Sequence, residues 1–202
     1  MESSINKRKE ALKLLKKKAV IRPRDLVAHN IARSTLSRLC AQGVVQKVGR
    51  GLYRLADAEV SEHDMLVDAC KTATNGVICL LSALRFHDLT TQSPHQIWMA
   101  IDVKARTPKT ELPIKFVRFS GPALQQGVLT HKQHGATIRV YSPAKTVADC
   151  FKFRNKIGLD VALEALRECH SKRLCSMDEL WQYAKLCRVS NVMRPYLEAM
   201  TL

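Results

Sequence analysis

Residues 21–55 read IRPRDLVAHNIARSTLSRLCAQGVVQKVGRGLYRL, and this stretch decides the fold of the first part of the chain. Pro23 can begin a helix, because its missing N–H would be unsatisfied at that position in any case. We expect a short helix from Arg24 to His29, a turn at Asn30-Ile31, and a second helix from about Ala32 to Gln42.

The second of these helices has one apolar face and one cationic, hydroxyl-bearing face. Ala32, Leu36, Leu39 and Cys40 recur at three- and four-residue spacing, which is typical of a face that packs inward. The remaining positions carry two arginines and three hydroxyl side chains without an acid: Arg33, Ser34, Thr35, Ser37 and Arg38. Such side chains are suited to reading base edges in the major groove of DNA.

A β-hairpin is expected after Gly43, a residue suited to the left-handed conformation that ends many helices. Residues 44–48 form a β-branched strand, residues 52–55 form its return, and Gly49-Arg50-Gly51 makes the tip. Helix, turn, helix and hairpin together predict a winged helix-turn-helix. On the wing we expect three cations to hold phosphate or to probe the minor groove: Lys47, Arg50 and Arg54.

The distribution of charge favours an anionic partner. Residues 1–60 hold 14 Lys and Arg against 5 acids, no acid lies between Leu26 and Arg54, and the whole chain carries a net charge of +15. Surfaces that meet phosphate lack the mixed signs of an ordinary solvated surface. A basic helix over Ser4–Lys18 is either a solubilising face or a supporting phosphate contact. We prefer the second interpretation and assign that role to Lys16, Lys17, Lys18 and the nearby Arg22.

The rest of the chain predicts an α+β fold in two domains. We expect a DNA-binding domain over residues 1–58 and a larger mixed α/β domain over residues 59–202. Residues 96–141 alternate apolar and polar side chains, which indicates a small, mostly antiparallel sheet, and residues 142–202 read as C-terminal helices. A second basic surface would add phosphate contacts to the DNA footprint, or would meet an acidic toxin or the toxin's nucleic-acid substrate: Lys104, Arg106, Lys109, Lys115 and Arg118.

The cysteines, the histidines and the hydropathy of the chain indicate whether it holds disulfides, metals or membrane spans. Seven cysteines at scattered apolar positions indicate reduced, buried thiols, and no pair has the spacing of a zinc knuckle or a thioredoxin-like site. His131 and His134 have no nearby thiol or carboxylate in sequence, so we expect no metal and no cofactor. No apolar run approaches the roughly 18 residues of a membrane span. The start of the chain lacks a signal-peptide layout, so we expect a cytoplasmic protein.

Catalysis finds little support in the residues. A metal-dependent nuclease would need clustered carboxylates and a lysine, and Asp102, Glu111 and Lys115 follow one another at loose spacing with Pro113 between the last two. Phosphate-binding loops and nucleophile elbows are missing from the sequence. We therefore expect no enzyme. An RNA-binding module stays open as an alternative, although the aromatic content of 5% offers little material for stacking bases.

Three stretches resemble the AbiEi-type antitoxins, the regulatory halves of bacterial abortive-infection toxin–antitoxin pairs. The first is the wing over residues 48–55, VGRGLYRL. The second is residues 77–84, VICLLSAL, followed by His87-Asp88-Leu89 and Pro94. The third is residues 138–150, IRVYSPAKTVADC, similar to the family's strand-to-helix segment.

This resemblance implies a repressor that binds inverted repeats in its own promoter and takes part in phage defence. It also implies that the larger domain neutralises a cognate nucleotidyltransferase-like toxin. We give the polar residues of the second and third stretches a structural role. Ser82 and Ser142 would start helices, and Asp149 would hold a neighbouring donor.

Overall fold

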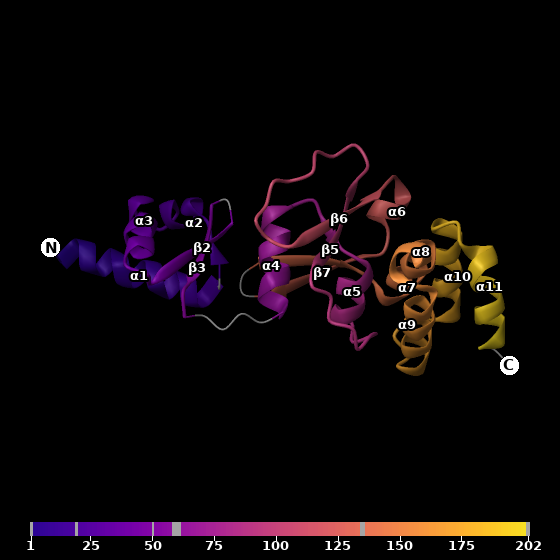
Figure 1. Cartoon of the computed structure of the whole chain (residues 1–202). Coiled ribbons are helices and arrows are strands. Elements are labelled where there is room, and N and C mark those ends of the chain that lie inside the picture. The colour runs from indigo at the N-terminus through magenta and orange to yellow at the C-terminus, as the bar shows by residue number, and fades with distance from the viewer. Residues whose placement is uncertain (1, 19, 50, 58–61, 134–135, 201–202) are drawn as a thin grey trace. The chain divides into compact units, whose positions relative to one another are not determined.

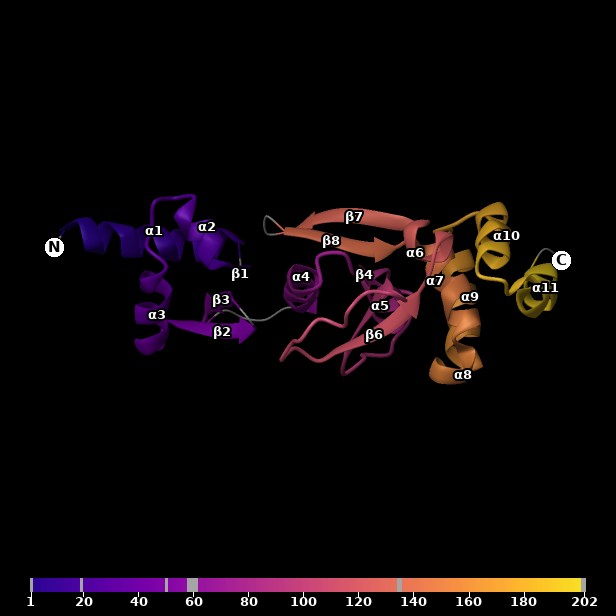
Figure 2. The same cartoon turned by 90° about the horizontal axis from the view of Figure 1, so that it is seen from above.

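The computed structural model describes residues 2–18, 20–49, 51–57, 62–133 and 136–200. The chain divides into two compact units, each of which is described by itself (Figures 1 and 2). Unit 1 comprises Met1–Thr74, Pro108–Pro113 and Lys132–Ile138. Unit 2 comprises Asn75–Thr107, Ile114–His131 and Arg139–Leu202. The boundary expected between residues 58 and 59 stays a prediction.

Unit 1 combines four helices with a three-stranded sheet among its described residues. Its elements are α1 (Glu2–Lys18), β1 (Val20–Ile21), α2 (Pro23–Val27), α3 (Ser34–Ala41), β2 (Val45–Gly49), β3 (Leu52–Leu55) and α4 (Glu62–Thr72). The strand order is β1-β3-β2 and both pairings are antiparallel. The expected cap of α4 by Ser61 lies outside the described residues.

Local signals set the short elements of unit 1. Pro23 begins α2 as expected, and Asn30 takes the turn with a φ of 55°. Gly43 has a φ of 68°, which confirms its predicted left-handed position after α3. The core joins α1, α2, α3 and β2 through Ala11, Leu15, Ile21, Leu26, Ile31, Leu36, Leu39 and Val45.

A mixed five-stranded sheet lies at the centre of the remaining fold. Its strands are β4 (Val77–Ile78), β5 (Ile97–Asp102), β6 (Ile114–Phe119), β7 (Val128–Gln133) and β8 (Ala136–Tyr141), in the order β6-β5-β4-β8-β7. β5 pairs with β6 and β4 with β8 in parallel, whereas β4 and β5 are antiparallel. The expectation of a mostly antiparallel sheet is thereby corrected, because crossover connections set strand direction and alternation within a strand does not report them.

Helices cover this sheet and form the C-terminal end of the chain. They are α5 (Leu80–Phe86), α6 (Pro122–Gln125), α7 (Pro143–Lys152), α8 (Arg154–Ile157), α9 (Leu159–Ser171), α10 (Met177–Leu186) and α11 (Ser190–Ala199). Ser142 caps α7 as predicted. Ser82 does not start α5, since Cys79 precedes its first residue; the Ser82 hydroxyl accepts a hydrogen bond from Trp98 N at 2.9 Å.

Helix α7 is the central helix of unit 2. Every residue from Ala144 to Phe151 is buried, although that segment includes Lys145, Thr146 and Asp149. The helix packs against α5, α9 and α10, and Figure 1 shows α9 and α10 beside it. In the described part of the chain, no helix is both long and apolar enough to cross a membrane.

Candidate nucleic-acid interface

Helix α3 presents four of its five predicted base-reading side chains to solvent. Arg33, at the N-cap, and the helical residues Ser34, Ser37 and Arg38 are exposed. Leu36 and Leu39 are each 1% exposed and fix the opposite side of the helix in the core. We call Arg33, Ser34, Ser37 and Arg38 the α3 face. Their spacing of one, three and four residues places them on one side of a helix.

The fifth predicted side chain does not share this face. Thr35 is 6% exposed and lies next to Leu36 on the inward side of α3. Thr35 is two residues from Ser37, a rotation of about 200° around the helix, so its side chain lies on the side away from Ser37 and near Leu39. The sequence offered no signal to separate it from the neighbouring hydroxyl residues.

The hairpin separates its cations between two faces. Lys47 is exposed and pairs with Tyr53, while Arg54 pairs with Gln46. Directly opposed residues share a face, and neighbours along a strand do not, so Lys47 and Arg54 point to opposite faces. Arg54 is half-buried, and its Nε and Nη2 atoms lie 3.1 Å from the Gln46 amide oxygen in the orientation that satisfies both groups. Arg50 lies outside the described residues.

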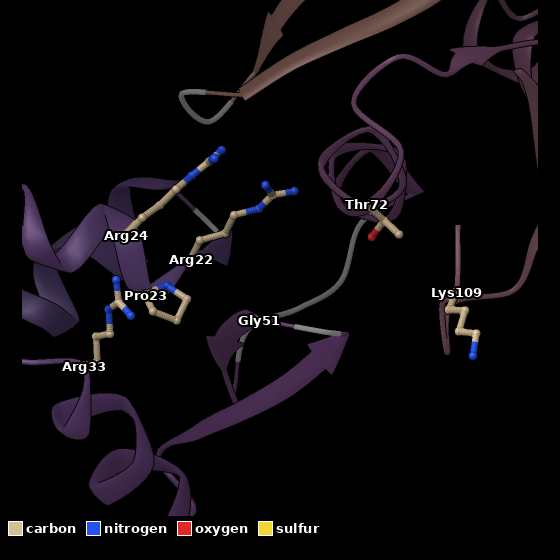
Figure 3. A pocket seen from close by; sticks show the side chains of 7 residues that line it. All are labelled: Arg22, Pro23, Arg24, Arg33, Gly51, Thr72 and Lys109. Carbon is tan, nitrogen blue, oxygen red and sulfur yellow. The ribbon is translucent and has the colours of Figure 1, made fainter. Parts of the chain in front are cut away.

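A cationic cavity of about 400 Å³ lies in unit 1. Its lining consists of Arg22, Pro23, Arg24, Arg33, Gly51, Thr72 and Lys109. Figure 3 shows three guanidinium groups, from Arg22, Arg24 and Arg33, and the Lys109 ammonium group among these side chains. Four cations without a carboxylate make this cavity suited to an anion such as a phosphate group.

Backbone structure explains how the arginines of the cavity are held. Arg22 precedes α2, and its backbone N–H donates to Asp25 Oδ2 at 2.7 Å. Burial lowers the pKa of Arg22, and the neighbouring charge of Arg24 lowers it further. An anion in the cavity would oppose both effects, because it favours the charged guanidinium groups. Sequence analysis singled out Arg22 but missed Arg24, whose position directly before Asp25 gave no signal of an anion-binding role.

The predicted supporting cations of α1 differ in exposure. Lys16 and Lys17 are exposed in the last turn of α1, where cations also suit the negative end of the helix dipole. Lys18 is half-buried, and its Nζ atom lies 4.0 Å from Asp25 Oδ1. Lys16 and Lys17 are therefore better placed than Lys18 to contact a solvent-side anion.

Two of the predicted supporting cations in unit 2 already have partners within the protein. Lys115 Nζ lies 4.0 Å from the centre of the Trp98 ring. Arg118 donates to the carbonyl oxygens of Asp102 and Ala105 and to Thr107 Oγ1, and so holds the loop after β5. Lys104 and Arg106 in that loop are exposed.

The described residues contain no group of three or more His, Cys, Asp or Glu side chains that could hold a metal ion. Asp102, the first carboxylate considered for a nuclease, accepts from the backbone N–H of Lys104 at 2.7 Å and so caps a turn. His131 packs against the Phe86 ring at a centroid distance of 5.0 Å, and His134 lies outside the described residues.

Unit 1 combines a basic helical module, an exposed α3 face and an anion-suited cavity. Residues 9–56 match the family described as "Transcriptional regulator, AbiEi antitoxin". The match confirms the resemblance drawn from the wing over residues 48–55, and it runs from within α1 to the residue after β3. A comparison with curated proteins gives no match.

Proposed function

We propose that the chain is a sequence-specific DNA-binding repressor that autoregulates its own operon. In this proposal residues 20–55 form a winged helix-turn-helix, α3 enters the major groove, and the β2–β3 hairpin is the wing. The observation that carries the proposal is the α3 face, four exposed polar or cationic side chains inside a segment that matches a family of transcriptional regulators. Arg33 and Arg38 would donate to guanine, and Ser34 and Ser37 would contact bases or phosphate.

The hairpin and the cavity supply the phosphate contacts in this proposal. Lys47 is exposed on the wing, and Arg50 at its tip extends the same role. Arg22 and Arg24 line the cavity beside Arg33, so a backbone phosphate placed there would lie close to a base-reading residue. Phosphate contacts of this kind fix the register of a recognition helix without carrying sequence information.

The second part of the proposal is an antitoxin role for the larger domain, residues 59–202, against a nucleotidyltransferase-like toxin. The family description names an antitoxin, but its match lies in residues 9–56, so the role of the larger domain is supported by the resemblance of residues 138–150 to the family's strand-to-helix segment. The toxin partner itself rests on that resemblance alone. The basic side chains Lys104 and Arg106 extend the DNA footprint or meet the toxin.

Full-length variants test both roles in one strain. The double variant Arg33→Ala/Arg38→Ala should lose repression of a promoter reporter while still restoring growth beside the toxin encoded by the adjacent gene. The matched control is Arg167→Ala, an exposed arginine on α9 with the same change of charge per site. Loss of growth rescue in the double variant would mean that antitoxicity acts through DNA and would overturn the division of roles.

Binding to DNA rather than RNA needs a separate measurement. At about 150 mM salt, where ionic attraction is partly screened, the protein should prefer a duplex from its own promoter to a structured RNA of equal charge. Fluorescence anisotropy titrations with the two labelled ligands measure the ratio of Kd values. A tighter complex with the RNA would contradict the proposed repressor function and favour an RNA-binding module.

A further inference from the structure

The thiols of Cys169 and Cys175 lie against each other at the corner between α9 and α10. Their Sγ atoms are 2.8 Å apart, and both cysteines are free. Cys169 is fully buried on the last turns of α9, whereas Cys175 is half-buried and reachable from solvent. A disulfide bond is about 2.05 Å long, so bond formation needs an approach of about 0.8 Å.

The backbone on both sides of the corner holds the two thiols in place. Helix α9 ends at Ser171, Arg173 follows with a φ of 52°, and Leu174 N donates to Cys169 O at 3.0 Å. This turn brings the chain back over Cys169. Immediately after Cys175, the Ser176 and Glu179 side chains cap α10 with bonds of 3.2 and 2.8 Å to each other's backbone N–H groups. The corner is therefore ordered before any bond forms between the sulfurs.

We propose that Cys169 and Cys175 are an oxidative modification site that closes to a disulfide when the protein meets hydrogen peroxide. The Cys175 thiolate attacks the peroxide oxygen, which gives a sulfenic acid on Cys175 and releases water after proton uptake. The Cys169 thiol then attacks that sulfur, the S–S bond forms, and a second water leaves. In sum, two thiols are oxidised, one peroxide is reduced, and two water molecules are produced.

The environment of the pair gives the two sulfurs different roles. The hydrogen bond between the two thiols lowers the pKa of Cys175 and raises the pKa of Cys169, and burial raises the pKa of Cys169 further. The more accessible sulfur is thus also the better thiolate, which is the arrangement of an attacking and a resolving cysteine. In a reducing compartment such a bond is transient and reports oxidant rather than stabilising the fold.

Peptide mapping of the full-length protein tests the site. After exposure to hydrogen peroxide and blocking of free thiols with N-ethylmaleimide, trypsin should release peptide 168–172 (ECHSK) linked to peptide 174–185 (LCSMDELWQYAK). The pair should weigh less than the two reduced peptides by two hydrogen atoms, and a reductant should separate it. Recovery of both peptides as maleimide adducts or as sulfinic acids, without the linked pair, would overturn the proposal.

Variants separate this pair from general thiol oxidation. Cys175→Ser removes the linked peptides, whereas Cys40→Ser, which changes the half-buried thiol of α3, should leave their yield unchanged. Cys169→Ala should slow alkylation of Cys175 several-fold at neutral pH, because the donor that stabilises its thiolate is gone. Intrinsic fluorescence of Trp181 on α10 shows that each variant is folded. Unchanged alkylation in folded Cys169→Ala would refute the assigned roles.

Discussion

Lys145 Nζ lies 2.5 Å from Asp149 Oδ2, and both side chains are completely buried, one turn apart on α7. The second carboxylate oxygen of Asp149 accepts from the Cys187 thiol at 3.2 Å. The ammonium group of Lys145 also lies 4.1 Å from the centre of the Tyr141 ring and 5.0 Å from that of Phe119. Burial raises the pKa of Asp149, and the charge of Lys145 opposes that effect. The pair confirms the expectation that Asp149 holds a neighbouring donor.

This buried pair predicts strong coupling between two substitutions. Lys145→Met or Asp149→Asn alone should lower the free energy of unfolding by about 3–5 kcal/mol, because each leaves one unpaired buried group. The double variant should lose less than the sum of the two. Urea unfolding followed by tryptophan fluorescence suits this measurement, since both tryptophans, Trp98 and Trp181, lie in unit 2. Additive losses would show that the two charges do not interact.

We expect a substitution of Gly127 to destabilise the fold through both backbone strain and side-chain packing. Its φ is 76°, and a Cβ atom added there would lie 2.8 Å from Lys145 Cβ, whose side chain is held by Asp149. Gly127→Ala should therefore lower the free energy of unfolding by about 2–4 kcal/mol, the sum of a left-handed alanine and an overpacked contact. The control is Gly121→Ala, where φ is 53° and a Cβ atom meets nothing within 4 Å. If the two variants lost equal free energies of unfolding, the contact with Lys145 would not contribute to the cost of Gly127→Ala.

Asp68 predicts a pH dependence in unit 1. The side chain is 1% exposed, and its Oδ1 atom lacks a hydrogen-bond partner among the described residues. Burial raises its pKa from 3.8 to about 6, against the lowering effect of Lys71 and Arg54. The folded state thus binds this proton more tightly than the unfolded state, so the contribution of Asp68 to stability falls as pH rises from about 4 through 6.

Asp68→Asn should accordingly stabilise unit 1 at pH values above 6 by about 1–3 kcal/mol and lose this advantage below the unfolded pKa. Hydrogen-exchange protection of α4, compared between variant and parent at matched pH, measures the difference. Asp57→Asn, an exposed site in the same unit, is the control and should change little. A variant that is equally stabilised at all pH values would exclude ionisation of Asp68 as the cause.

The α3 face predicts losses that depend on DNA sequence. Arg33→Ala or Arg38→Ala should weaken binding to the operator by about 1–3 kcal/mol and leave a scrambled duplex almost unaffected. Titration of each variant against both duplexes measures this, with Arg167→Ala as the charge-matched control. Equal losses on both duplexes would make these arginines phosphate contacts instead of base readers.

Arg24 lines the cavity but is not part of the α3 face, and we expect it to behave differently from Arg33 and Arg38. Arg24→Ala should weaken both duplexes by similar amounts and reduce the slope of log K against log salt by about one. Measurements at several salt concentrations give that slope directly. A loss confined to the operator, with an unchanged slope, would place Arg24 on a base edge.

Local patterns in the sequence determined much of unit 1 and several helix starts in unit 2. Pro23, Gly43 and the spacing of Leu36 and Leu39 predict α2, the end of α3 and its inward face, because these signals act within one or two turns of chain. The same holds for the Ser142 cap of α7 and for the capping box that begins α10. The excess of cations over acids, and with it the expectation of an anionic partner, also follows from the sequence alone.

Only the tertiary structure decided how distant segments meet. It paired β5 with β6 and β4 with β8 in parallel, buried Thr35, and placed Lys47 and Arg54 on opposite faces of the hairpin. It also enclosed Lys145 with Asp149 and brought Cys175 onto Cys169. Strand direction depends on the path of a crossover, and burial of a polar side chain depends on which partner reaches it from elsewhere in the chain. Neither the direction of a strand nor the burial of a polar side chain follows from a local spacing of two, three or four residues.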